Sequence, residues 1–125
     1  MARILLAEDD AGLCNVLAAA LRKAGHEVDA VECGRTGLAR LQAKRYDLLL
    51  ADVVMPGLDG IELARRAGTR WPGIRVMFIT GFAAVALSPR SDPPAGARVM
   101  SKPFHLNELA RQVEEVLTAD PTPPG

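Results

Sequence analysis

The chain has few cysteines, few aromatic residues and no excess of either charge. Only two of its 125 residues are cysteines, Cys14 and Cys33, and their separation matches no metal-binding or redox motif. We therefore expect two reduced thiols in a cytoplasmic protein. Basic and acidic residues number 15 each, so the formal net charge is zero. That balance argues against a nucleic-acid groove or an anionic membrane surface as the main partner.

Long apolar runs and targeting signals are also missing. Apolar residues make up 49% of the chain, but no run has the length of a membrane span. The N-terminus lacks the charged, apolar and cleavage regions of a signal peptide. The glycines form no phosphate-binding loop, which argues against a nucleotide-dependent enzyme. His26 and His105 have no partner motif, and we expect surface or packing roles for them.

The one clear shift in composition is at the end of the chain. Residues 119–125 include Pro121, Pro123 and Pro124. Proline at this density cannot continue a helix, so a flexible tail is expected over 119–125. The length before it suits one domain with a substantial core, over residues 1–118, and no second domain is expected.

Short apolar segments alternate with helical patterns along the domain. Strands are predicted at 3–7, 27–31, 48–52, 75–79 and 98–101. Helices are predicted around 13–24, around 38–41, from Asp59 to about 69, and around 106–117. This alternation predicts an α/β fold: a doubly wound, five-stranded parallel sheet with helices on both faces.

Several helix ends can also be read from the sequence. Asp10 is a good N-cap for the first helix, and Gly25 suits its end. Asp59 followed by Glu62 resembles a capping box for the third helix. A fourth helix over 82–87 should be short or irregular, because the proline-rich segment after it cannot be helical.

Charged and polar residues follow four of the predicted strands. Glu8, Asp9 and Asp10 follow the first strand, Asp52 ends the third, and Thr80 and Lys102 follow the fourth and fifth. The carboxyl ends of parallel strands meet at one crevice, so these side chains should share a pocket. A pocket with several carboxylates needs a cation or must hold protons. Magnesium, which takes oxygen ligands, is the expected cation.

The residues can be given separate roles in this pocket. Asp9 and Asp52 are the expected direct ligands, because Asp10 is the better helix cap. Glu8 can act through a bound water, and the Val54 carbonyl can complete the shell. Asp52 is the candidate nucleophile for phosphoryl transfer, giving an aspartyl phosphate.

Two further groups suit phosphoryl transfer. Thr80 can hydrogen-bond a phosphoryl oxygen, and Lys102 offsets its charge. A metal-dependent phosphohydrolase is an alternative, but it requires a second acid beside Asp52, and Val53 and Val54 supply none.

These motifs resemble the receiver domain of two-component response regulators over residues 3–118. The resemblance depends on Glu8-Asp9-Asp10, Asp52, the segment 55–60, Thr80-Gly81 and Lys102-Pro103-Phe104. It implies a flavodoxin-like fold, Mg²⁺, and phosphate taken from a phosphohistidine on a histidine kinase or phosphotransferase. Such a domain is a phosphoacceptor that assists its own phosphorylation and dephosphorylation, not an enzyme acting on a separate substrate.

Segments 1–10, 59–66 and 78–87 further resemble the stand-alone CpdR-type receivers of alphaproteobacteria. That resemblance implies an adaptor for regulated ClpXP proteolysis in cell-cycle control. The unphosphorylated form would engage the ClpX unfoldase, and phosphorylation would end this. A phosphorelay shuttle or phosphate sink with no adaptor role has the same active site and stays open as an alternative.

Two positions depart from the common receiver pattern. Val99 stands three residues before Lys102, where receivers often have Tyr or Phe, so the usual aromatic switch is missing. The chain also ends without the small apolar pair that ClpX-type unfoldases commonly grip. Separately, Phe82, Val85, Leu87 and Val99 form a candidate exposed apolar patch, and because such patches often mark partner sites we predict an output surface centred on it.

Overall fold

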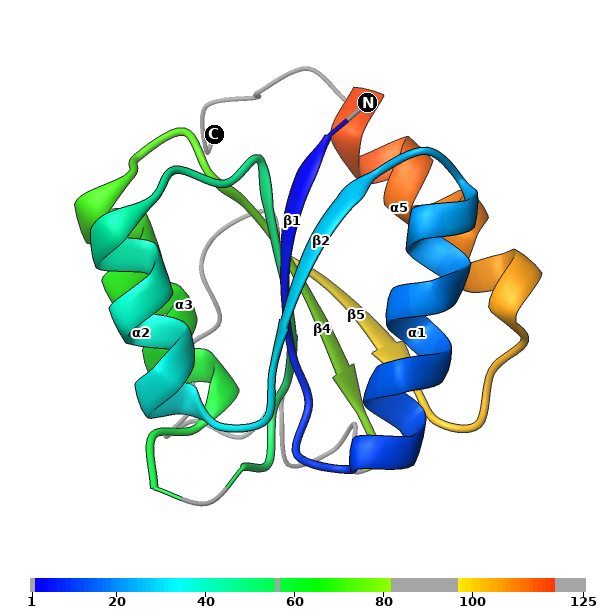
Figure 1. Ribbon diagram of the computed structural model, residues 1–125, viewed down its shortest axis with the longest axis horizontal. Helices are drawn as coiled ribbons and strands as arrows, with labels where there is room; N and C mark the ends of the chain where they lie inside the picture. Colours follow the sequence, from blue (N-terminus) through cyan, green and yellow to red (C-terminus); the bar gives the residue numbers. More distant parts are fainter. Residues whose placement is uncertain (1, 56, 82–96, 119–125) are drawn as a thin grey trace.

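The computed structural model describes residues 2–55, 57–81 and 97–118 and confirms the predicted α/β architecture. Its single described sheet has five parallel strands in the order β2-β1-β3-β4-β5 (Figure 1). The strands are β1 (Arg3–Ala7), β2 (Glu27–Val31), β3 (Leu48–Asp52), β4 (Arg75–Thr80) and β5 (Arg98–Ser101). The predicted fourth helix over 82–87 and the predicted tail over 119–125 lie outside the described residues.

The described helices cover both faces of the sheet. They are α1 (Ala11–Lys23), α2 (Gly34–Ala43), α3 (Gly60–Arg70) and α5 (Leu106–Thr118). In Figure 1, α2 and α3 lie on one side of the sheet and α1 and α5 on the other. Among the described residues, none of these helices has the length and hydropathy to cross a bilayer.

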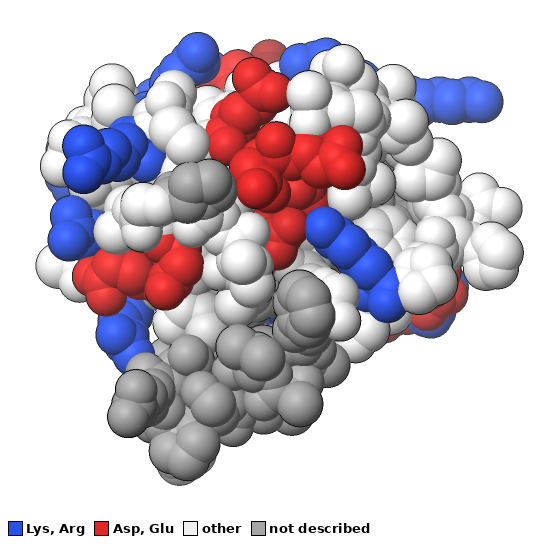
Figure 2. All heavy atoms as spheres, turned by 90° about the horizontal axis from the view of Figure 1, so that it is seen from below, with Lys and Arg blue, Asp and Glu red and all other residues white. Residues whose placement is uncertain are grey.

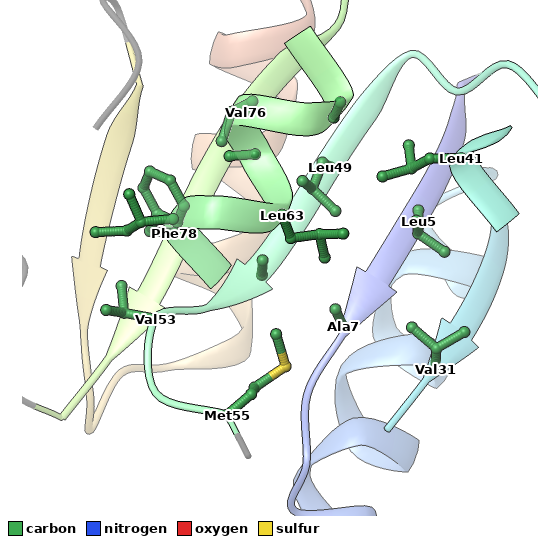
Figure 3. Packing of buried hydrophobic residues seen from close by; sticks show 14 of the residues in the cluster. Leu5, Ala7, Val31, Leu41, Leu49, Val53, Met55, Leu63, Val76 and Phe78 are labelled. Atoms are coloured by element: carbon green, nitrogen blue, oxygen red, sulfur yellow. The ribbon is translucent and has the colours of Figure 1, made fainter. Parts of the chain in front are cut away.

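Alternate residues of each central strand pack against opposite helix layers. Leu5 and Phe78 face the layer of α2 and α3, where they pack with Leu41 and Leu63 (Figure 3). Their strand neighbours belong to a second core cluster with α1 and α5, which includes Ile4, Leu6, Leu50 and Met77. Burial on both faces explains why β1, β3 and β4 are nearly continuous apolar runs. The edge strand β2 is less buried: only Val28 and Val31 are buried, and Glu27 and Ala30 are exposed.

The helix ends follow the sequence signals, with one difference. The Asp10 carboxylate accepts a hydrogen bond from Leu13 N at 3.0 Å, and Gly25 adopts φ 101° after α1. Asp59 likewise accepts from Glu62 N at 2.8 Å. In a full capping box the Glu62 carboxylate would also accept a hydrogen bond from the Asp59 backbone N–H. Here it pairs instead with Arg65 and Arg66, three and four residues further along the helix.

The strand order explains where the polar residues meet. After β1 the chain moves to β2 on one side, whereas β3 pairs with β1 on the other side. A parallel sheet has its ligand crevice at such a reversal, outside the carboxyl ends of the strands. The polar residues after β1 and at the end of β3 therefore lie at this crevice.

Candidate functional site

The sheet register brings the polar strand ends side by side. Ala7 pairs with Ala51, so Glu8, directly after β1, and Asp52, the last residue of β3, occupy corresponding positions at neighbouring strand ends. On the other side of β3, Thr80 is the last residue of β4 and pairs with Ser101, directly before Lys102. The predicted pocket residues therefore occupy four adjacent strand ends.

Three carboxylates form the acidic part of the site. Glu8, Asp9 and Asp52 each place one carboxylate oxygen within 4.8 Å of the others. Glu8 and Asp52 are 0% and 5% exposed, whereas Asp9 is exposed. Figure 2, which views this end of the molecule, shows acidic side chains gathered near the middle of the face. The cluster therefore extends from the protein interior to the solvent.

Lys102 supplies a positive charge to the two buried carboxylates. Its Nζ lies 2.9 Å from Asp52 Oδ2 and 3.0 Å from Glu8 Oε1. Its backbone N–H donates to the Thr80 carbonyl at 2.7 Å, which fixes the residue at the end of β5. Partial burial lowers the pKa of the Lys102 ammonium, but the two carboxylates outweigh this effect and leave the pKa above its usual value. The side chain is therefore a permanent cation at neutral pH.

Glu8 is held in an unusual environment. Its Oε2 accepts a hydrogen bond from Asp10 N at 3.0 Å. Its Oε1 is buried without a hydrogen bond of good geometry, although the Lys102 ammonium is close. Burial is the main cause that raises the pKa of Glu8 to about 7, and the Asp52 charge adds to it.

Asp52 is positioned by the backbone that follows it. Its Oδ1 accepts a hydrogen bond from Val54 N at 3.0 Å. The next turn leads to Gly60 at the start of α3, where Gly60 N donates to the Val53 carbonyl at 3.1 Å. A β-carbon on Gly60 would lie 2.1 Å from the Asp52 carbonyl oxygen. The sequence shows Gly60 directly after the N-cap residue Asp59, but its close approach to Asp52 is visible only in the structure.

The residues present fit a divalent cation. Three carboxylates face one ammonium, and one buried carboxylate oxygen has no hydrogen bond. Carboxylate oxygens are the ligands that Mg²⁺ takes in proteins. Asp10 is used as the α1 cap, and so it is Asp9 that joins the cluster.

The other predicted residues are placed as follows. Thr80 is fully buried at the end of β4, and Val54 is 49% exposed beside Asp52. Val99, in β5, is partly buried and packs against the core cluster under α2 and α3. Phe82, Val85 and Leu87 of the predicted output patch lie outside the described residues.

Comparison with known proteins establishes the family. The model of the response regulator receiver domain matches residues 4–114. The chain belongs to this receiver domain family. It is 54% identical over 119 residues to the response regulator receiver protein CpdR of Brucella abortus, covering 95% of this chain and 99% of that protein. It is also 32% identical to the transcriptional regulatory protein TcrA of Mycobacterium tuberculosis. That match covers 97% of this chain but only 48% of TcrA.

Solved receiver structures share the fold. The response regulator TrrA of Thermotoga maritima, crystallised in complex with Mg²⁺-BeF, superposes with a TM-score of 0.83 at 28% identity, covering 93% of this chain and 99% of that one. The receiver domain of the hybrid histidine kinase CckA gives a TM-score of 0.80 at 32% identity, with coverage of 93% and 99%. The observed strand order and helix layers are thus those of a receiver.

Proposed function

We propose that this chain is a receiver that is phosphorylated on Asp52 and requires Mg²⁺. The observation that carries the proposal is the surroundings of Asp52. One carboxylate oxygen accepts from the Val54 amide, and the other lies 2.9 Å from the Lys102 ammonium. Glu8 and Asp9 complete an acidic cluster around the same carboxylate. A carboxylate held in this way is oriented and charge-compensated for attack on a phosphoryl group.

The chemistry follows from these contacts. An Asp52 oxygen forms a bond to phosphorus while the phosphorus–nitrogen bond of a donor phosphohistidine breaks, and the imidazole leaves with the electron pair. Glu8, Asp9, Asp52 and the Val54 carbonyl would hold Mg²⁺, which neutralises charge on the phosphoryl oxygens. Lys102 stabilises the same charge from the β5 side, and the Thr80 hydroxyl donates to a phosphoryl oxygen. The donor is a histidine kinase or histidine phosphotransferase.

We further propose that the unphosphorylated form is an adaptor that engages the ClpX unfoldase for regulated proteolysis in cell-cycle control. The support is the likeness to CpdR over almost the whole of that protein. In this proposal residues 1–118 form the receiver, residues 119–125 are a flexible tail, and the protein acts in the cytoplasm. The output surface includes Phe82, Val85, Leu87 and Val99. The chain then acts as a phosphoacceptor that helps its own phosphorylation and dephosphorylation, and it has no separate substrate.

The phosphorylation proposal is tested by intact mass. The protein is incubated with Mg²⁺ and acetyl phosphate, and a phosphoryl adduct is expected on the wild type. Asp52→Asn should lose the adduct. Asp59→Asn is the matched control, because Asp59 caps α3 and asparagine is an equally good N-cap. Full labelling of Asp52→Asn would rule out the assignment.

A pulldown separates the adaptor from a phosphorelay shuttle. Immobilised protein is exposed to purified ClpX, with and without prior phosphorylation, and Asp52→Asn serves as the form that cannot be phosphorylated. An adaptor retains ClpX only when unphosphorylated. Failure of both the wild type and Asp52→Asn to retain ClpX, while a phosphotransferase is still retained, would favour the shuttle.

A further inference from the structure

A groove runs between α2 and α3, away from the acidic cluster. It has a volume of about 410 Å³ and is lined by Leu38, Leu41, Gln42, Arg66, Thr69 and Arg70. Its lining includes none of the carboxylates of the phosphorylation site. The volume lies in the range of sites that accept a few side chains or a small ligand. The groove is therefore a second concave feature with its own chemistry.

The groove has an apolar floor on a fixed frame. Leu38 is partly buried and packs above the core cluster that contains the fully buried Leu41. The Trp71 indole N–H donates to the Leu41 carbonyl at 2.7 Å, which ties the end of α3 to α2. The Arg70 guanidinium stacks over the Trp71 ring, 4.2 Å from its centroid. One rim of the groove is thus held in place by an aromatic–cation contact.

The two helices that form the groove carry more basic than acidic residues, in a chain that is neutral overall. Helices α2 and α3 contain five arginines and a single acidic residue, Glu62. Lys44 and Arg45 follow α2 directly. Most of these cations are already paired: Arg65 and the groove residue Arg66 with Glu62, and Arg40 and Lys44 with Asp29. Within the described part of the chain no carboxylate pairs with Arg70, so Arg70 is the groove cation that is left for a partner.

We propose that this groove docks a short segment of a partner protein that combines acidic side chains with one or two apolar ones. The Arg70 guanidinium at the rim is complementary to a carboxylate, and arginine is enriched at the energetic centres of interfaces. Leu38 offers apolar surface for a side chain between those carboxylates. A nucleic acid matches the charge but not the apolar floor, because its affinity depends on phosphate contacts. This docking site is separate from Asp52 and goes beyond the phosphorylation chemistry.

The experiment is a selection from a random peptide display library on the immobilised protein. Arg70→Glu serves as the decoy for counter-selection. Enriched peptides should combine acidic and apolar residues, and binding should fall by about tenfold or more in Arg70→Glu. In NMR titrations the same peptides should shift the amide signals of Leu38, Gln42 and Thr69. Leu38→Gln, which keeps the charge, should also weaken binding and covers the case in which Arg70→Glu fails to fold.

Lys23→Glu is the matched control, because Lys23 is also a last-turn helix cation but lies in α1 on the other face of the sheet. It should leave peptide binding unchanged. Asp52→Asn should also bind normally, so failure of the phosphorylation proposal and failure of this one are distinguishable. Absence of any peptide that distinguishes wild type from Arg70→Glu would overturn the proposal. The proposal would also be overturned if Arg70→Glu left peptide binding unchanged but abolished self-association of the chain, or its binding to single-stranded DNA or phosphatidylserine vesicles.

Discussion

Gly60 lies directly against the backbone of Asp52. A β-carbon at position 60 would approach the Asp52 carbonyl oxygen to 2.1 Å, far below van der Waals contact. The nearest atoms are backbone and not the end of a flexible side chain, so the clash cannot be relieved by a rotamer change. The first residue of α3 thus sets the position of the candidate phosphoacceptor.

Gly60→Ala should therefore displace the turn after β3 and impair the site. We expect a loss of about 1–3 kcal/mol in the free energy of unfolding, as for other overpacked positions. Phosphorylation by acetyl phosphate should slow as well, because the Asp52 carboxylate moves away from Lys102. Urea denaturation and the rate of adduct formation by mass spectrometry measure the two effects.

Gly68→Ala is the control for that substitution on the same helix. A β-carbon at Gly68 meets no atom within 4 Å, and alanine is the better helix former. Gly68→Ala should raise the free energy of unfolding by about 0.5–1 kcal/mol and leave phosphorylation unchanged. Equal behaviour of the two variants would contradict the steric role of Gly60.

Asp9 is a proposed Mg²⁺ ligand whereas its neighbour Asp10 caps α1, and alanine at each position should separate these two roles. Mutating a residue that only hydrogen-bonds to a metal ligand typically weakens metal binding by about 10–100-fold. If Asp9 is a direct ligand, Asp9→Ala should weaken Mg²⁺ binding by at least that much. Asp10→Ala should instead cost about 1 kcal/mol of stability, because α1 loses its N-cap. Titration calorimetry with Mg²⁺ and thermal unfolding give both readouts. Unchanged Mg²⁺ affinity in Asp9→Ala would remove Asp9 from the site.

Much of the fold could be predicted because its signals are local. The buried runs of β1 and β3, the Asp10 cap and the Gly25 stop each depend on residues close in sequence. Strand-end placement then implied that Asp52 and Lys102 meet, and they do at 2.9 Å. The phosphoryl-transfer roles assigned to them remain predictions.

Features that depend on distant packing could not be predicted. Full burial of Glu8, and hence its raised pKa, results from the combined cover of several elements. The contact of Gly60 with Asp52 depends on the path of the turn between β3 and α3. The groove between α2 and α3 likewise depends on how two helices pack, which periodicity does not specify.

Glu8 should make the stability of the metal-free protein depend on pH. Its pKa in the folded state is about 7, above the usual 4.5, so the folded state binds the proton more tightly than the unfolded state. The stabilisation from this proton is complete below pH 4.5 and is lost as pH rises to about 7. Glu8→Gln should remove this component. The difference in unfolding free energy between the two proteins, measured without Mg²⁺ at a series of pH values, isolates it from other titrating groups. A difference that stays constant between pH 4.5 and 7 would show that Glu8 is not shifted.

Tyr46 and Asp29 link the edge strand to the loop before β3. The Tyr46 hydroxyl donates to Asp29 Oδ2 at 2.5 Å, and Lys44 Nζ lies 3.1 Å from the same oxygen. The hydrogen bond from Tyr46 lowers the pKa of Asp29, while burial and that carboxylate raise the pKa of Tyr46 to about 12. Hydrogen bonds to charged groups contribute about 1.5–3 kcal/mol.

Tyr46→Phe should therefore destabilise the protein by about 1–2 kcal/mol at neutral pH. This value is at the low end for a hydrogen bond to a charged group, because Lys44 still pairs with Asp29 in the variant. Asp29 has a depressed folded-state pKa, so its stabilising contribution is present above its unfolded value and is lost as pH falls through the folded one. The cost of Tyr46→Phe should shrink in strong acid for this reason. Urea denaturation at neutral and acidic pH measures the change, and Asp29→Asn, alone and combined with Tyr46→Phe, completes a double-mutant cycle. A cost that does not vary with pH would mean that the hydroxyl is not bonded to an ionised Asp29.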